Sequence, residues 1–175
     1  MKGSKIVRRF LVPSFIVSII YAMKHGCLIS PRAEVELTSN LTIGKRTQIG
    51  SFTKIKASDG KLDIGADSFI GNNCFISADL AGVRIGDFAM ISASVSIIGN
   101  NYRYDDLSTP VCLQEKTSKG ITIGTDVWIG AGSVVLDGSV IGSGCIIAPN
   151  SVVSGDIPAH SVAQGDPAVV VFERR

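Results

Sequence analysis

The sequence predicts an all-β protein, a parallel β-helix of short strands, and two repeating patterns carry this prediction. A branched aliphatic residue returns at every sixth position between residues 121 and 153. A small residue stands two positions before most of these aliphatics, where the walls of a narrow coil converge. A strand has a period of two and a helix one of 3.6, so a strict six indicates coils stacked around a shared core. The repeated aliphatics are Ile123, Ile129, Val135, Ile141, Ile147 and Val153.

Glycines mark the corners between the short strands. Gly124, Gly130 and Gly142 each follow a repeated aliphatic directly. Glycine permits a positive φ or the close approach of another backbone without steric cost, and either property suits a sharp corner. We therefore expect a coil of short straight sides that meet at tight turns.

Length and composition set the size and kind of domain. The 175 residues are enough for one domain, and 45% hydrophobic with only 6% aromatic residues favours a core of branched aliphatics. A formal net charge of +2 is too small to indicate a nucleic-acid partner. We place the β-helix domain at 27–171, after a separate segment at 1–26 and before a basic tail at 172–175.

The four cysteines have no CxxC spacing, which argues against a redox or metal motif. Cys74 and Cys145 fall at the small inward position of the repeat, so we expect free thiols, as in a protein of the reducing cytoplasm. No cluster of His, Cys or carboxylate residues has ligand spacing, so we expect no metal cofactor.

Residues 1–26 differ from the rest of the chain. Four Lys or Arg residues among the first nine precede an apolar run over 10–23, which at 14 residues is too short to span a bilayer. No convincing signal-peptide cleavage site follows this run. Two interpretations stay open: a helical cap over the first coil, or a basic anchor lying on the inner membrane surface. We favour the cap, because the open end of a β-helix needs cover.

The repeat spacing also predicts the shape of the coil. It lengthens from six residues to nine after Ile55 and again after Ile76. The extra residues, near 58–61 and 79–82, include Asp and Gly, which favour turns. A longer connection at every third corner indicates a three-sided coil with one decorated edge.

The largest interruption is an insert over residues 99–120, between the equivalent positions Ile97 and Ile123. The insert is polar and contains Tyr102 and Tyr104 among several turn-forming residues. Long excursions from a rigid scaffold are the usual home of functional groups. We therefore favour a functional loop over one that only packs a subunit interface.

Three motifs resemble those of the hexapeptide-repeat acyltransferases. The stretch at 123–132, IGTDVWIGAG, is similar to the family's IGxxVWIGAG, and GDPA at 165–168 is similar to its GxPA ending. The insert, with NYRYDD at 101–106, resembles that of members that acetylate sugars of surface polysaccharides. The resemblance covers residues 28–171 and implies that the parallel β-helix is left-handed. The N-terminal helical segment and the long loop excursion are expected from the residues themselves.

The same resemblance implies a function. The family's members are typically homotrimers that bind acetyl-CoA in the groove between neighbouring β-helices. We therefore expect a cytoplasmic acetyltransferase that uses acetyl-CoA to modify a sugar of a surface polysaccharide, or its nucleotide- or lipid-linked precursor. Small residues in the VWIGAG motif would let the pantetheine arm lie against the backbone. The expected cofactor-binding residues are Trp128, Gly130, Ala131, Gly132, Pro149 and Pro167.

The resemblance places the catalytic group at the start of the insert, with one departure. Related polysaccharide acetyltransferases usually read NHRYDD, with the histidine as general base for the acceptor hydroxyl. Here Tyr102 fills that position, and Asn100 stands where some relatives carry a histidine. A phenol has an ordinary pKa of about 10, so Tyr102 is a weak base at neutral pH. The expected catalytic residues are Asn100, Asn101, Tyr102 and Asp105.

Three interpretations of this departure remain. An amine acceptor, such as an amino sugar, can attack the thioester without a histidine. Alternatively, Asp105, Asp106 or the His160 of a neighbouring subunit serves as the base for a hydroxyl. In the third interpretation the protein is a catalytically silent trimer acting as a binding partner, because Gly155 and Val169 replace residues that are often cationic in the family. We favour the enzyme.

Overall fold

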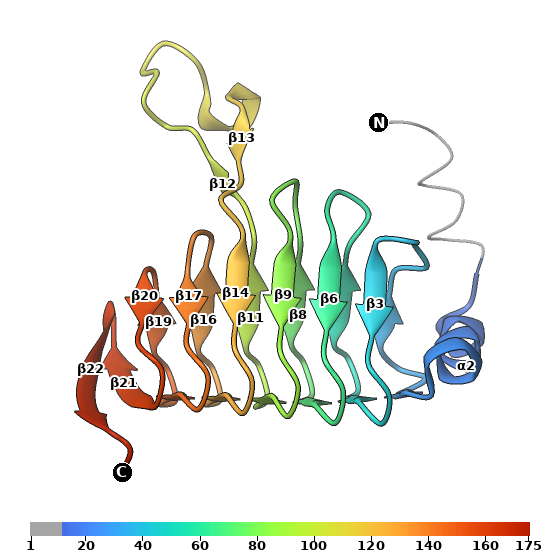
Figure 1. The fold of residues 1–175 in the computed structure, drawn as a ribbon. Helices are drawn as coiled ribbons and strands as arrows, with labels where there is room; N and C mark the ends of the chain where they lie inside the picture. Colours follow the sequence, from blue (N-terminus) through green and yellow to red (C-terminus); the bar gives the residue numbers. More distant parts are fainter. Residues whose placement is uncertain (1–11) are drawn as a thin grey trace.

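The computed structural model describes residues 12–175, which form a helix followed by a three-sided parallel β-helix (Figure 1). Successive strands pass from a first sheet to a second and then to a third, and each turn of the coil stacks on the turn before. The helix covers one end of the prism and an antiparallel strand pair closes the other (Figure 1). This arrangement agrees with the three-sided coil that the spacings predict.

The strands of each sheet follow one another in coil order. The first sheet contains β1 (Leu28–Ile29), β4 (Gln48–Ile49), β7 (Phe69–Ile70), β10 (Met90–Ile91), β15 (Trp128–Ile129), β18 (Ile146–Ile147), β21 (Ser161–Gly165) and β22 (Ala168–Glu173). The second contains β2 (Glu34–Val35), β5 (Lys54–Lys56), β8 (Phe75–Ser77), β11 (Ser96–Ile98), β16 (Val134–Leu136) and β19 (Val152–Val153). The third contains β3 (Leu41–Ile43), β6 (Leu62–Ile64), β9 (Val83–Ile85), β14 (Ile121–Ile123), β17 (Val140–Ile141) and β20 (Asp156–Ile157).

The core consists of the repeated aliphatics, which point inward and stack on their equivalents in the next coil. In the first sheet Ile70 pairs with Ile91, and Ile91 pairs with Ile129. All three side chains are fully buried. Burying one such side chain contributes about 1.5–3 kcal/mol, so the ladder of aliphatics is the main source of stability.

The corners show which property of glycine the fold uses. The glycines that directly follow an aliphatic do not have positive φ; instead, the next coil comes too close for a side chain. A Cβ on Gly130 would lie 2.5 Å from the backbone nitrogen of Pro149. Positive φ occurs two residues later, at Asp126 and Gly132 for example. Close approach is therefore the reason for glycine after the aliphatic.

The helix α2 (Ser14–His25) packs against the first coil. It ends at Gly26, which has a left-handed φ of 65°, and it buries Val17 and Tyr21. The Tyr21 hydroxyl donates a hydrogen bond of 3.0 Å to the backbone carbonyl of Glu36. One face of α2 therefore covers the open end of the prism. The rest of the predicted segment, residues 1–11, lies outside the described residues.

At the other end β22 runs antiparallel to β21, and its residues reach Glu173, past the predicted boundary at 171. The Arg174 guanidinium donates a hydrogen bond of 2.6 Å to the carbonyl of Gly144. The start of the basic tail is thus bound to the prism.

The insert leaves the second sheet after β11 and returns to the third sheet at β14. It therefore projects from the edge between these two sheets, where the shorter extra segments also lie (Figure 1). It contains an antiparallel strand pair, β12 (Asn101–Tyr102) and β13 (Lys116–Thr117), and the 3-10 helix η1 (Val111–Leu113). The decorated edge that the spacings predict is confirmed.

Candidate active site

The neck of the insert is a two-stranded ladder. Tyr102 lies opposite Lys116, and the backbone N–H of Arg103 donates a hydrogen bond of 2.9 Å to the carbonyl of Glu115. The ammonium of Lys116 lies 5.5 Å from the centre of the Tyr102 ring. A cation at this distance is attracted to an aromatic face, so the pair stiffens the neck.

Two carboxylates on the prism hold the ends of the insert. Asp79 is buried, and its carboxylate accepts a hydrogen bond of 2.9 Å from the side-chain amide of Asn100. Asp137 lies one coil further along and accepts backbone hydrogen bonds of 2.8 Å from Lys119 and from Gly120. The start of the insert is thus fixed from the preceding coil and its end from the following one.

A cleft of about 820 Å³ lies between the base of the insert and the second-sheet edge of the prism. A cleft of this size is within the usual range for small-molecule sites. The four residues predicted to be catalytic all line it, so the structure brings them together. The lining residues are Ile98, Asn100, Asn101, Tyr102, Arg103, Tyr104, Asp105, Thr117, Lys119, Leu136, Asp137 and Ser154.

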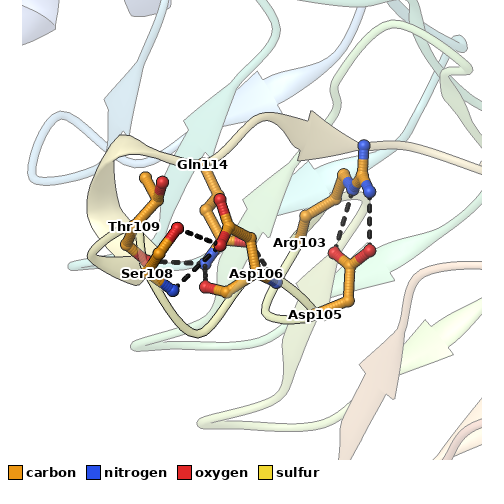
Figure 2. Close-up of polar contacts among 6 residues, drawn as sticks. All are labelled: Arg103, Asp105, Asp106, Ser108, Thr109 and Gln114. Atoms are coloured by element: carbon orange, nitrogen blue, oxygen red, sulfur yellow. Dashed lines mark hydrogen bonds and ion pairs between the residues drawn. The ribbon is translucent and has the colours of Figure 1, made fainter.

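Asp105 is held by its neighbour in the insert. The Arg103 guanidinium contacts both oxygens of the Asp105 carboxylate, at 3.0 and 2.6 Å (Figure 2). These hydrogen bonds lower the pKa of Asp105. A carboxylate with a lowered pKa is a poor proton acceptor at neutral pH, so Asp105 is suited to binding and shaping rather than to general base catalysis.

Asp106 shapes the distal part of the insert. Its carboxylate accepts hydrogen bonds from the hydroxyl and the backbone N–H of Ser108, at 2.6 and 2.9 Å (Figure 2). Hydrogen bonds from Ser108 and Thr109 lower the pKa of Asp106 to about 2. The Gln114 side-chain amide donates to the carbonyls of Asp106 and Thr109, at 2.8 Å each. Asp106 is therefore an ionised structural residue at neutral pH.

The histidines of the described residues lie away from this cleft. His160 is exposed, with a positive φ, at the corner between the third and first sheets. His25 ends α2, where it stacks on Tyr21 with ring centres 5.6 Å apart. Within one chain, neither supplies a base to the cleft.

The residues predicted to bind the cofactor follow a different edge of the prism. Trp128 points outward from the first sheet and is 44% exposed, and its indole N–H donates a hydrogen bond of 3.0 Å to the hydroxyl of Ser92. Gly130, Ala131 and Gly132 form the corner that follows, between the first and second sheets. Trp128 is thus held in one orientation at the start of this corner.

The next two turns of the coil continue the same edge. Pro149 lies directly beside Gly130. The backbone N–H of Gly165 donates a hydrogen bond of 3.2 Å to the hydroxyl of Ser151, which places the turn at Pro167 beside this corner. All six residues predicted to bind the cofactor therefore lie along one edge, over three successive coils.

Within one chain the two groups lie apart. The insert projects from the edge between the second and third sheets (Figure 1), whereas Trp128 lies on β15 of the first sheet. Within one chain the cleft and the predicted cofactor edge therefore belong to different edges of the prism.

Three positioning residues were not recognised in the sequence: Asp79, Ser92 and Asp137. Each contacts its partner from a neighbouring coil, 17 to 36 positions away in the chain. Of the three, only Asp79 has a signal in the sequence, because it is the Asp of the extra segment at 79–82. Over residues 12–175, no group of three His, Cys or carboxylate residues is arranged to hold a metal ion.

Comparison with known proteins identifies the class. A family model for a bacterial transferase hexapeptide of six repeats matches residues 120–155, and one for a hexapeptide repeat of succinyl-transferase matches 61–101. The chain is 36% identical, over 152 residues, to dTDP-4-amino-4,6-dideoxy-D-glucose acyltransferase of Escherichia coli. That match covers 83% of this chain and 78% of the relative. The chain therefore belongs to the hexapeptide-repeat transferases, and it is an acyltransferase of that family.

Other relatives carry related names. A Mycobacterium tuberculosis protein named as an acetyltransferase is 35% identical over 137 residues, which are 78% of this chain and 45% of that longer protein. WbbJ of Escherichia coli, named for O-acetyl transfer in lipopolysaccharide biosynthesis, is 26% identical over 95% of this chain and 86% of its own length. The predicted family and the predicted acyltransferase class are confirmed.

Solved structures confirm the fold class, a β-helix of hexapeptide repeats with an N-terminal helix. AntD, an N-acyltransferase from Bacillus cereus in complex with dTDP and 3-hydroxybutyryl-CoA, superposes with a TM-score of 0.76 at 22% identity. The superposition covers 86% of this chain and 81% of AntD. A hexapeptide-repeat acetyltransferase from Vibrio cholerae complexed with acetyl coenzyme A gives 0.64 at 23% identity, over 98% and 83% of the two chains.

Proposed function

We propose that the protein is an acetyl-CoA-dependent acetyltransferase that acts, as a homotrimer, on an amino sugar carried by a nucleotide or lipid precursor of a surface polysaccharide. The observation that carries this proposal is the cleft at the base of the insert, which gathers amides and charged groups but no histidine. The names of the relatives, which include an amino-sugar acyltransferase, support the same class of acceptor.

The donor would lie along the edge formed by the VWIGAG corner and the two coils beyond it. Ala131 and Gly132 are exposed there, so a pantetheine arm can approach the backbone closely. The fixed indole of Trp128 would form the wall beside the thioester. Acyltransferases of this fold that carry CoA in their structures support this choice of donor.

The acceptor would lie in the cleft, held by the amides of Asn100 and Asn101, with the Tyr102 ring as part of the wall. Lys119, which also lines the cleft, adds a positive charge suited to the diphosphate of a nucleotide-linked sugar. Two carboxylates line the cleft, and both are engaged: Asp105 is bound to Arg103, and Asp137 accepts backbone hydrogen bonds from Lys119 and Gly120. An amine needs less activation than a hydroxyl, which favours N-acetylation.

The reaction needs only groups that the two substrates bring. The unprotonated amine attacks the carbonyl carbon of the thioester, and the bond between carbon and sulfur breaks. CoA leaves as the thiolate, and the nitrogen loses one proton, which neutralises the thiolate either directly or through water. The protein's contribution would be to hold both substrates at the reacting distance and to exclude competing water.

The outer face of the first sheet supports self-association. The outward positions of β1, β7, β10 and β15 hold the exposed apolar residues Leu28, Phe69, Met90 and Trp128, with the polar Gln48 of β4 between the first two. Outward positions of the third sheet include charged pairs such as Asp63 beside Arg84. An apolar face of this kind is typical of a subunit interface. Assembly through it would also bring a neighbour's insert close to Trp128.

A cytoplasmic location fits the same picture. Cys27, Cys74 and Cys145 are buried free thiols, and Cys112 is an exposed one. Free thiols persist most readily in a reducing compartment.

The experiment is a transfer assay with two matched acceptors. One is dTDP-4-amino-4,6-dideoxy-D-glucose, and the other is the same nucleotide sugar with a hydroxyl at carbon 4. With acetyl-CoA as donor, we expect acetylation of the amine at a rate at least about tenfold above that of the hydroxyl. Preference for the hydroxyl would overturn the amine acceptor. Absence of transfer to any amino sugar or sugar hydroxyl tested would favour the silent trimer.

A further inference from the structure

The outer face of α2 is apolar and exposed. Phe15, Ile19 and Met23 follow one another at spacings of four along the helix and are 53%, 55% and 84% exposed. Ile16 and Ile20 widen the same stripe. We call these five residues the outer stripe of α2. Such a stripe costs free energy in water, so it indicates a surface that something covers.

The outer stripe is separate from the face that caps the β-helix. Val17 and Tyr21 point to the prism and are buried, and Ser14 donates a hydrogen bond of 3.0 Å to the carbonyl of Pro31. The helix is therefore fixed on the end of the prism (Figure 1), and its outer stripe is left exposed. Side-by-side assembly through the first sheet would leave this end of the prism open.

The charges around the helix identify the occupant. Residues 1–33 contain six Lys or Arg residues and no Asp or Glu, although the whole chain has nearly balanced charge. Two of these cations belong to the described part: Lys24 lies in the last turn of α2, and Arg32 follows the helix. Protein partners bind apolar stripes without requiring so one-sided a charge. An apolar stripe in a segment whose charged residues up to position 33 are all cationic matches an anionic lipid surface.

We infer that α2 lies flat on an anionic bilayer, with its outer stripe among the acyl chains and the cations at the phosphates. At 12 residues and about 1.5 Å per residue, the helix is about 18 Å long. Among residues 12–175 no helix is long and apolar enough to cross a membrane. The cap and the anchor, set out above as alternatives, are thus two faces of one helix.

Assembly would strengthen this contact, a step that rests on the proposed homotrimer. In a trimer of parallel prisms all three helices lie at the same end, so one particle places three outer stripes on the membrane together. Binding through several weak sites exceeds the affinity of each one. An enzyme held in this way would meet a lipid-linked acceptor at the surface that carries it.

The test is co-sedimentation of the full-length protein with vesicles. We expect binding to vesicles of mixed phosphatidylglycerol and phosphatidylcholine, weaker binding as salt rises from 50 to 500 mM, and little binding to phosphatidylcholine alone. The Ile19→Ser/Met23→Ser variant should lower the partition coefficient at least about tenfold. Its circular dichroism and thermal midpoint should match those of the wild type, because both side chains are exposed.

A matched control separates the helix from general loss of apolar surface. Leu80 and Leu107 are 85% and 98% exposed and lie on the decorated edge and in the insert. The Leu80→Ser/Leu107→Ser variant should bind vesicles as the wild type does. The inference would be overturned if the α2 variant bound vesicles as well as the wild type does. It would also be overturned if the wild type bound neutral vesicles as well as anionic ones. A third contradicting result would be that the wild type does not bind vesicles while the α2 substitutions change its oligomeric state. None of these readouts requires acyl transfer, so they are independent of the proposed activity.

Discussion

Tyr102 lies on β12 in the cleft, with the ammonium of Lys116 5.5 Å from its ring. A histidine at this position would lie beside the same cation, which would lower the pKa of the imidazole and favour the neutral form that accepts a proton. We predict that Tyr102→His raises acetyl transfer to a sugar hydroxyl by about 10- to 100-fold. Tyr102→Phe should leave transfer to an amine unchanged. A large loss in Tyr102→Phe, with no gain in Tyr102→His, would contradict the role assigned to this position.

The hydrogen bonds of Asp106 make the order of the insert depend on pH. The pKa of Asp106 in the folded protein is about 2, below its ordinary 3.8. A carboxylate whose pKa is lowered by folding stabilises the folded structure fully when the pH is above its ordinary pKa. This stabilisation is lost as the pH falls through the lowered pKa of the folded state. We predict that hydrogen exchange across residues 107–114 accelerates between pH 4 and pH 2, beyond the change in intrinsic rate. Asp106→Asn, which cannot titrate, should show no such step.

At the scale of elements, α2 depends on one buried hydroxyl. Tyr21 donates to the carbonyl of Glu36, and burial raises the pKa of the phenol. Tyr21→Phe leaves its carbonyl partner without this donor and should lower the free energy of unfolding by about 1–2 kcal/mol. The measurement is the urea midpoint of full-length protein. Tyr104→Phe is the matched control, and because Tyr104 is exposed it should change stability by less than about 0.5 kcal/mol.

The elements also show how far sequence reasoning reaches. The six-residue period predicts the coil because each repeat buries its aliphatic in the same way, and the nine-residue spacings locate the decorated edge. The insert was predicted for the same reason: an interruption of 22 residues in a strict period is visible without any structure. These features are periodic along the chain, so a single sequence contains them.

Contacts between coils are not visible in this way. The pairing of Asp79 with Asn100, and of Ser92 with Trp128, depends on which residues are stacked at a corner. The register of one coil on the next can be read from the sequence only after every extra residue has been assigned to a turn. The same reason explains the glycines: the close approach of Pro149 to Gly130 is a property of two coils, not of one corner.

At the scale of the whole molecule, the central expectation is that one chain is incomplete. The first sheet carries an exposed apolar column, and Phe69 is its outward residue on β7. We predict that Phe69→Lys converts the proposed trimer to monomers in analytical ultracentrifugation and abolishes acyl transfer, because a buried unpaired charge is strongly unfavourable.

The matched control for this prediction lies on the third sheet. Val140 also points outward from its strand and is 46% exposed, close to the 45% of Phe69. Val140→Lys should keep both the trimer and the activity. Loss of assembly in both variants, or in Val140→Lys alone, would place the interface elsewhere.

The most direct measurement is calorimetric titration of the purified protein with acetyl-CoA. We predict one site per chain with a dissociation constant near the micromolar range, a binding free energy of about −8 kcal/mol. Ala131→Glu puts bulk and negative charge on the exposed cofactor corner and should weaken binding at least about tenfold, whereas Ala159→Glu, at an exposed corner elsewhere, should not. No detectable binding by the wild type would contradict the acyltransferase assignment, and equal binding by both variants would move the donor away from the VWIGAG edge.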